Sequence, residues 1–211
     1  MKGNLIIISS PSGGGKGTLI KEILNSVPHI GYSVSYTTRE RRIGEEDGRH
    51  YFFVSREKFD ALIASGEFLE YAEVHGNLYG TSITQVNSEL ELGRDIILEI
   101  DVQGAESVRK KVPDAVSIFI LPPSFDVLKA RLTYRETEKQ EDLALRLQNS
   151  TDEVRRFNEF EYIVINDSVE RASGDLRAII LAERLKRDRQ TDPIRVILDS
   201  FDGAILNNSG D

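Results

Sequence analysis

A glycine-rich segment lies between a short apolar run and a helical pattern near the N-terminus. Together with the apolar run 4–9 it predicts a strand, a turn and a helix in succession. Such a turn lets successive backbone N–H groups point at phosphate oxygens, and a lysine adds a full positive charge. The segment therefore predicts a site for a nucleoside triphosphate. Its residues are Ser10, Pro11, Ser12, Gly13, Gly14, Gly15, Lys16, Gly17 and Thr18.

The segment differs at two positions from the P-loop pattern G-x-x-x-x-G-K-[ST]. Ser10 stands at the first glycine, which is a mild change if its φ stays negative. Gly17 stands where a Ser or Thr hydroxyl would meet Mg²⁺, and it offers no oxygen. Thr18 is the nearest substitute, but one residue further on it points elsewhere on the helix.

A second group of polar residues suits the acceptor of a phosphoryl group. Two arginines three residues apart, with two tyrosine hydroxyls, would neutralise and orient a phosphate dianion. A single carboxylate with Ser and Thr hydroxyls matches the paired N–H donors and carbonyl of guanine, whereas adenine would leave a buried carboxylate without a donor. These residues are Ser35, Arg39, Arg42, Tyr51, Glu70, Tyr79 and Thr81.

Apolar runs that alternate with helical patterns must position these residues. Short β-branched runs predict buried strands, and apolar residues at helical spacing predict helices. Their alternation predicts an α/β fold with a parallel sheet that helices flank on both faces. The predicted strands are 4–9, 96–100, 116–121 and 162–165, and the predicted helices are 16–26, 82–92, 105–111, 124–132, 142–160 and 169–189.

The polar segment between about residues 34 and 88 interrupts that rhythm and predicts an inserted subdomain. Within or beside it we expect an extended or loop segment at 31–46, a strand at 51–54, a helix at 55–66 and a hairpin over 68–81. The polar stretch 133–141 is the expected hinge region. Beyond residue 190 we expect a short helix at 193–201 and a frayed end.

Two acidic residues lie at the carboxyl end of the second buried strand. Glu99 and Asp101 alternate, so on a strand both carboxylates would share one face at its carboxyl end, where open α/β sheets bind ligands. We hypothesise that Asp101 reads guanine and that Glu99 orients water bound to Mg²⁺. The alternative is a pair of solvated acids at a strand end.

Composition excludes several functional classes. The chain has 211 residues, with 27 Lys and Arg against 35 Asp and Glu, so its formal net charge is −8. An acidic protein repels nucleic acids and anionic membranes. Without cysteine there is no disulfide, thiol nucleophile or thiolate metal site, and no apolar run approaches the ~20 residues that span a bilayer. We expect a soluble cytoplasmic protein that binds neither nucleic acid nor membrane.

Ordered motifs from about residue 4 to 187 resemble the guanylate kinase family. The resemblance is carried by 10–16, Ser35-Tyr-Thr-Thr-Arg39 with Arg42, 48–53, 68–70, 76–81, Ile100-Asp-Val-Gln-Gly104, 119–123 and 165–167. It implies transfer of a phosphoryl group from ATP to GMP or dGMP with Mg²⁺. It also implies a three-layer P-loop kinase with an inserted mixed α+β subdomain that binds the monophosphate, and a helical lid.

The resemblance also implies a role for each matching residue. Lys16, Arg39, Arg135 and Arg146 would act in catalysis, with Arg131 from the lid on ATP and Asn166 near the adenine. Arg39, Arg42, Tyr51 and Tyr79 would hold the GMP phosphate, and Ser35, Glu70, Thr81 and Asp101 would read guanine. The implied regions are a core (1–33, 89–124 and 157–190), a GMP-binding subdomain (34–88), a lid (125–156) and a tail (191–211).

Departures from the family pattern leave alternatives. Glu99 replaces the usual Asp, and Glu136 replaces the glycine that usually follows the lid arginine Arg135. One alternative is a non-catalytic guanylate-kinase-like interaction module, against which Lys16, Arg135 and Arg146 argue. Another is a monophosphate kinase with a different acceptor. A homo-oligomer also stays open.

Overall fold

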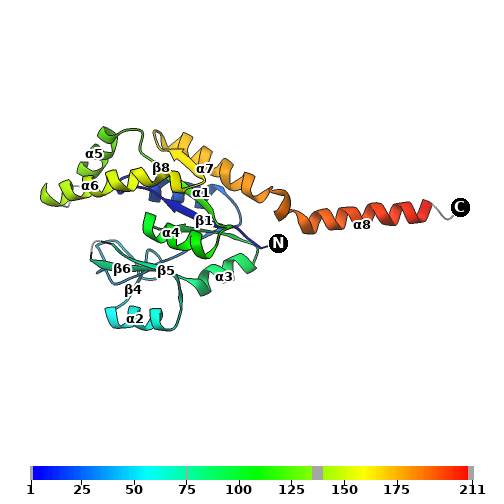
Figure 1. Cartoon of the computed structure of the whole chain (residues 1–211), viewed down its shortest axis with the longest axis horizontal. Coiled ribbons are helices and arrows are strands. Elements are labelled where there is room, and N and C mark those ends of the chain that lie inside the picture. The colour runs from blue at the N-terminus through cyan, green and yellow to red at the C-terminus, as the bar shows by residue number, and fades with distance from the viewer. Residues whose placement is uncertain (1, 75, 135–139, 209–211) are drawn as a thin grey trace.

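A five-stranded parallel sheet forms the centre of the molecule (Figure 1). The computed structural model describes residues 2–74, 76–134 and 140–208. All neighbouring strands of this sheet run parallel. Their order is β2 (Ile30–Tyr32), β7 (Asp95–Glu99), β1 (Leu5–Ser9), β8 (Val116–Leu121) and β9 (Tyr162–Ile165).

Helices cover both faces of the sheet, which makes three layers. Alternate side chains of a strand point to opposite faces. Leu5 and Ile7 of β1 therefore pack in one cluster with α3 (Ile83–Glu91) and α4 (Val102–Lys111). Ile6 and Ile8 pack in the other cluster with α1 (Lys16–Ser26) and α7 (Val169–Arg184). Because β1 is buried on both faces, it reads as a continuous apolar run.

A smaller four-stranded sheet lies beside the core. Its strands are β4 (Phe52–Phe53), β3 (Tyr36–Thr37), β6 (Asn77–Ser82) and β5 (Phe68–Val74), in that order. The helix α2 (Arg56–Ala64) covers it through Phe59, whose ring lies 4.6 Å from that of Phe68. The hairpin of β5 and β6 agrees with the predicted one, although His75 lies outside the described residues.

Two helices lie between β8 and β9, and a further helix follows α7 at the C-terminus. The segments α5 (Phe125–Tyr134) and α6 (Gln140–Arg155) lie near the carboxyl ends of the strands, and a short turn of helix, Arg156–Glu159, leads from α6 to β9 (Figure 1). After α7, a short turn at Arg187–Arg189 leads into α8 (Thr191–Asn208). Among the described helices, none has both the length and the apolar character needed to cross a membrane. The cytoplasmic location stays a prediction.

The structure corrects several expected elements. Residues 30–32 form a strand, β2, at the edge of the sheet. Its three residues are only half-buried and do not form an apolar run, so the sequence alone does not indicate this strand. The helix α4 begins at Val102 rather than 105, α7 ends at Arg184 rather than 189, and α8 continues to Asn208 rather than ending at 201. The expected boundaries of core, subdomain, lid and tail stay predictions.

Candidate active site

The loop between β1 and α1, residues 10–15, forms a concave backbone surface at the carboxyl edge of the sheet. We call it the phosphate loop. Gly13 and Gly15 have φ of 82° and 87°, which side chains rarely adopt, and a Cβ at Gly15 would lie 2.3 Å from the amide nitrogen of Asn166. Gly15 caps α1 without a side-chain hydrogen bond. The first N–H groups of α1 are thus oriented to bind an anion.

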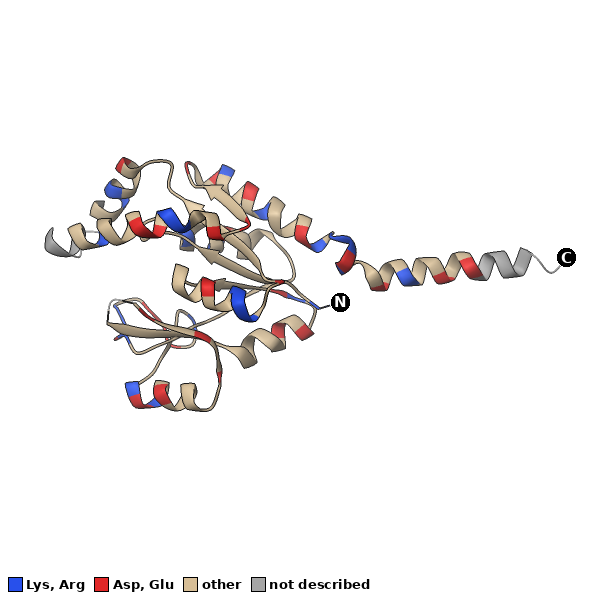
Figure 2. Cartoon of the chain, viewed as in Figure 1, with Lys and Arg blue, Asp and Glu red and all other residues tan. Residues whose placement is uncertain are grey.

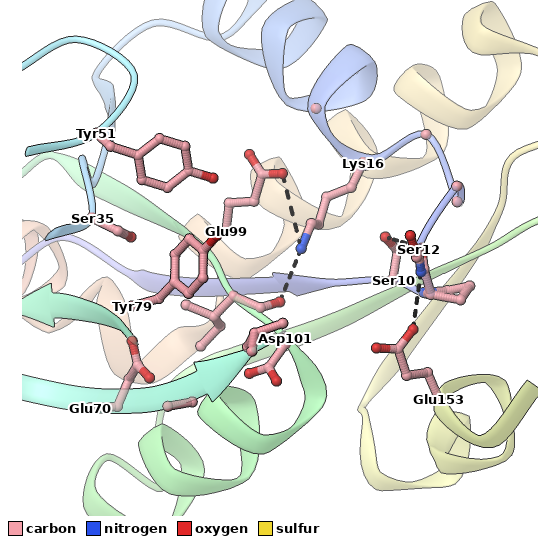
Figure 3. Close-up of a pocket in the computed structure, with 18 residues that line it drawn as sticks. Ser10, Ser12, Lys16, Ser35, Tyr51, Glu70, Tyr79, Glu99, Asp101 and Glu153 are labelled. Carbon is pink, nitrogen blue, oxygen red and sulfur yellow. Dashed lines mark hydrogen bonds and ion pairs between the residues drawn. The ribbon is translucent and has the colours of Figure 1, made fainter. Parts of the chain in front are cut away.

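Lys16 points from the first turn of α1 toward the end of β7 (Figure 3). Its Nζ donates a hydrogen bond to the carbonyl of Ile100 at 3.0 Å and lies 4.0 Å from Oε1 of Glu99. The other carboxylate oxygen of Glu99 accepts a hydrogen bond from the Tyr32 hydroxyl at 3.1 Å. Burial and the Glu99 charge raise the pKa of Tyr32, so this hydroxyl keeps its proton.

Two predicted ATP residues hold the phosphate loop from behind. The Asn166 side chain is 3% exposed and its Nδ2 donates to the carbonyl of Gly14 at 2.9 Å. Arg131 of α5 donates to the carbonyl of Asn166 at 2.9 Å and to that of Gly14 at 3.4 Å. Both residues therefore position the loop, and a contact of Asn166 with adenine stays a prediction.

One face of α6 contacts Ser12 in the phosphate loop. Arg146 donates to the Ser12 hydroxyl at 2.9 Å, and Ser150 donates to its carbonyl at 3.3 Å. Glu153 accepts from its backbone N–H at 3.0 Å, as Figure 3 shows. Sequence reasoning predicted Arg146 but missed Ser150 and Glu153. Ser150 follows Arg146 by four residues and Glu153 follows Ser150 by three, so the sequence could have placed all three on one helical face, although not against Ser12.

A buried carboxylate lies at the other side of the site. Glu70 on β5 is 4% exposed and accepts a hydrogen bond from the Thr81 hydroxyl at 2.6 Å. Burial, with help from the charge of Asp101, raises the pKa of Glu70 to about 7. A Cβ on Gly104 would lie 2.8 Å from Oε2 of Glu70, so the glycine gives this carboxylate its room. Sequence reasoning missed that role of Gly104.

Arg39 lies beside two tyrosines, Tyr51 just before β4 and Tyr79 on β6. Its guanidinium is 5.4 Å from the ring centre of Tyr51 and pairs with Glu45 at 2.7 Å. The hydrogen bond to Glu45 raises the pKa of Arg39, and so does a further hydrogen bond to Tyr79. Desolvation lowers this pKa, but by less than the hydrogen bonds raise it. Burial and Glu99 raise the pKa of Tyr51 to about 12, so it is a proton donor at neutral pH. Arg42 is exposed, and its backbone N–H donates to Glu45 at 2.8 Å.

One cavity of about 330 Å³ joins these two sides. It includes Lys16 at the phosphate loop and Glu70, Ser35, Tyr51 and Tyr79 on the acceptor side, as Figure 3 shows. It also includes residues that the sequence did not single out: Ala72, Val74, Ile100 and Glu153. The predicted residues that do not line the cavity are Thr18, Arg39, Arg42, Thr81, Arg131, Arg146 and Asn166. Arg135 lies outside the described residues, as does Glu136.

The two acidic residues at the end of β7, Glu99 and Asp101, both line the cavity but do not lie on one strand. β7 ends at Glu99, and Asp101 is the N-cap of α4, where its side chain accepts from the N–H of Gly104 at 2.8 Å. The expected alternation along one strand is therefore wrong, because the cap turns the chain into the helix at residue 102. Both carboxylates still reach the site, Glu99 beside Lys16 and Asp101 near Glu70.

The comparisons with known proteins agree with this geometry. The family model described as guanylate kinase matches residues 2–183. A curated guanylate kinase from Methylobacillus flagellatus is 53% identical over 190 residues, which is 90% of this chain and 94% of that protein. One from Carboxydothermus hydrogenoformans is 46% identical over 198 residues, 94% of this chain and 96% of that protein.

A solved structure gives the same result at the level of the fold. The crystal structure of guanylate kinase from Anaplasma phagocytophilum superposes with a TM-score of 0.74 at 33% identity, and the match covers 89% of each chain. The arrangement of the parallel sheet and its flanking helices is thus that of a known guanylate kinase structure. The chain belongs to the guanylate kinase family.

Proposed function

We propose that this chain transfers the γ-phosphoryl group of ATP to GMP or dGMP, giving ADP and GDP or dGDP. The observation that carries the proposal is the single cavity with Lys16 on one side and Glu70 on the other. A triphosphate on the phosphate loop and a guanine base on Glu70 would bring the two phosphate groups together between them. Direct in-line transfer follows from that arrangement.

Guanine recognition rests on the buried carboxylate. Glu70 has a hydrogen bond from Thr81 and is held in surroundings that disfavour its charge. Guanine would supply two further N–H donors to the ionised carboxylate, whereas adenine has no such pair. Ser35 and Asp101 line the same side of the cavity and complete the proposed base site. Arg39, Arg42, Tyr51 and Tyr79 would take the phosphate, so Arg39 would exchange Glu45 for it.

Catalysis would come from positioning and electrostatics. The acceptor oxygen belongs to a phosphate whose second pKa is about 6, so it is already ionised at neutral pH and needs no general base. Of the described histidines, His29 and His50 do not line the cavity. Lys16, with Arg146 and Arg135 from the lid, would stabilise the charge that develops on the transferred group. Closure of α5 and α6 would exclude water, which would otherwise hydrolyse ATP.

The residues near Lys16 fit a magnesium ion carried in by ATP. Mg²⁺ keeps most of its waters and needs only one or two carboxylates beside the phosphates. Glu99 meets that need from the cavity wall, and Gly17, which also lines the cavity, places no side chain beside its Oε1. When bound, the ion would neutralise charge on the β- and γ-phosphates. Glu99 would hold it through water.

Acceptor specificity tests the proposal against its alternatives. We expect a coupled assay of ADP release to give turnover with GMP and dGMP and little with AMP or UMP. Glu70→Gln should lower the preference for GMP over AMP, because an amide offers one acceptor and one donor where guanine needs two acceptors. Binding of GMP without turnover would instead favour the interaction module, and preference for AMP would contradict the role of Glu70.

A further inference from the structure

The five strands of the central sheet, all within the described part of the chain, carry only two charged residues, Asp95 and Glu99, at the two ends of β7. Figure 2 shows charged residues gathered on the helices around this sheet. Asp95 pairs with Arg184 at 2.7 Å, so its charge is compensated. Glu99 lies 4.0 Å from the Nζ of Lys16 and forms no closer ion pair with a described residue. Its carboxylate is thus available to a ligand in the cavity.

The side chain of Glu99 lies on the face of the sheet that α1 covers. Ile97, two residues earlier on β7, is buried in the core cluster that contains Leu19 and Ile20 of α1. Side chains two residues apart on a strand share a face, so the carboxylate comes close to the first turn of α1. A Cβ on Gly17 would lie 3.9 Å from Oε1 of Glu99, the one described atom beyond its own helix and chain neighbours within 4 Å. Oε1 therefore faces the place where a side chain of residue 17 would begin.

Tyr32 holds the other oxygen of this carboxylate. It lies on β2 opposite Ile97 and packs against the same core cluster. Its hydroxyl donates to Oε2 of Glu99 at 3.1 Å, whereas Oε1 accepts no hydrogen bond from a described residue. Figure 3 shows the carboxylate turned toward Lys16. The hydrogen bond from Tyr32 thus fixes Oε2 and leaves Oε1 directed into the cavity.

Residue 17 is the position at which the P-loop pattern has the Ser or Thr hydroxyl that binds Mg²⁺. Gly17 supplies no such oxygen, and Thr18 does not line the cavity. Oε1 of Glu99 is the side-chain oxygen that lies beside this position. A carboxylate oxygen is a ligand that suits Mg²⁺, directly or through water. The glycine and the glutamate are therefore complementary, because one lacks the oxygen that the other brings to the same place.

We propose that Glu99 takes the role of the missing hydroxyl, so that its Oε1 orients the Mg²⁺ that arrives with ATP, and that Tyr32 is the positioning residue that fixes this oxygen. The inference rests on the proposed function in one respect, the binding of ATP at the phosphate loop. Carboxylates at metal sites are themselves held by hydrogen bonds, and loss of such a bond lowers metal affinity roughly 10–100-fold. Tyr32 supplies that hydrogen bond here.

Calorimetric titration with a non-hydrolysable ATP analogue tests the exchange of Gly17 and Glu99. The ratio of its dissociation constant in EDTA to that in Mg²⁺ is the affinity gained from the ion, which we call the magnesium gain. We expect Glu99→Asp to lower the magnesium gain about tenfold, because the charge stays and only the oxygen draws back. Adding Gly17→Ser to Glu99→Asp should restore the gain, whereas adding Gly17→Ala, which brings no hydroxyl, should not.

Two results would overturn the exchange. One is a magnesium gain that Glu99→Asp leaves unchanged. The other is a double variant, Gly17→Ser with Glu99→Asp, whose magnesium gain is as low as that of Glu99→Asp alone. Circular dichroism confirms that each variant remains folded.

Removal of one hydroxyl tests the role of Tyr32. Tyr32→Phe keeps the ring in the core cluster and should lower the magnesium gain about fivefold, as expected for loss of one hydrogen bond. In a Glu99→Ala chain the same change should have no effect, because Tyr32 acts only through that carboxylate. Tyr162→Phe removes a hydroxyl that donates to Glu183 and is the matched control. No loss with Tyr32→Phe, or an equal loss in the Glu99→Ala chain, would overturn this role.

The magnesium gain needs no acceptor, so it separates this inference from the proposed function. An unmodified chain that shows the expected magnesium gains but releases no ADP with GMP would contradict the proposed function and support the role of Glu99. ADP release with GMP, together with a magnesium gain that Glu99→Asp leaves unchanged, would overturn the role of Glu99 alone. A chain that does not bind the analogue in Mg²⁺ would overturn both.

Discussion

The carboxylate of Glu153 on α6 accepts a hydrogen bond from the backbone N–H of Ser12 in the phosphate loop, at 3.0 Å. Arg146 and Ser150 contact the same serine from the same helical face. A carboxylate next to a triphosphate is electrostatically unfavourable, so its value lies in holding the loop. Glu153 is a positioning residue that joins α6 to the phosphate loop.

Glu153→Ala should raise the KM for ATP about fivefold, as expected for loss of one hydrogen bond of about 1 kcal/mol. The KM for GMP should change little, because Ser12 belongs to the loop that we propose to bind ATP. Glu153→Gln keeps an acceptor oxygen and should restore most of the ATP affinity. Asp152→Ala, one residue earlier at an exposed site that pairs with Arg155, is the matched control in steady-state kinetics. Equal effects on both substrates would contradict the assignment.

Lys16→Ala should reduce kcat about 10²–10³-fold, the usual effect of removing a preorganised charge from a reacting group. The midpoint of thermal unfolding should not change, because the end of the Lys16 side chain adds little to the core. Among the described residues, its Nζ contacts only the carbonyl of Ile100 and the carboxylate of Glu99. Lys21→Ala on the exposed side of the same helix is the control for loss of charge. Single-turnover measurements separate the loss of chemistry from weaker ATP binding.

Arg39→Ala should raise the KM for GMP and also lower kcat, because in the proposed function the same guanidinium would bind the acceptor phosphate and orient it for attack. Its contacts with Glu45 and Tyr51 hold that guanidinium beside the acceptor side of the cavity. Arg49→Ala removes an exposed arginine from the same segment and should leave both constants unchanged. A defect confined to the KM for ATP would disprove the role of Arg39.

The core elements and the phosphate loop could be predicted because local sequence determines them. β1 is a continuous apolar run, and glycines 13 and 15 adopt backbone angles that their residue type allows. β2 was missed because pairing with β7, rather than its own composition, makes it a strand. The alternation of Glu99 and Asp101 predicts that both lie on one strand, because this pattern does not indicate that the Asp101 side chain caps α4. The roles of Glu153 and Gly104 depend on contacts between distant segments, which one sequence does not reveal.

The stability of the protein should depend on pH through Glu70. Its pKa is about 7 in the folded chain and near 4.5 when exposed, so the folded state binds more protons between these values. The free energy of unfolding that Glu70 contributes therefore falls as the pH rises from 4.5 to 7. At about 1.4 kcal/mol per pKa unit, the loss is roughly 3 kcal/mol at pH 8.

Glu70→Gln removes this titration. As the pH rises, the free energy of unfolding of this variant should therefore increase relative to that of the unmodified chain. Urea unfolding of both chains at pH 5 and pH 8 measures the change in their difference. Glu73→Gln, at an exposed position of the same strand, is the control for the loss of a carboxylate. A difference that is the same at both pH values would contradict the burial of a neutral Glu70.

Gly17→Ser should lower the Mg²⁺ concentration needed for half-maximal turnover, because it restores a hydroxyl where the ion would meet the chain. Gly17 lies in the first turn of α1 without a positive φ, and a Cβ there would find Oε1 of Glu99 at 3.9 Å as its nearest contact, so the side chain fits without strain. Gly17→Ala adds the Cβ without the hydroxyl and should leave the Mg²⁺ requirement unchanged. A folded Gly17→Ser chain with no turnover would instead mean that ATP needs the space of this glycine for close approach of its phosphates.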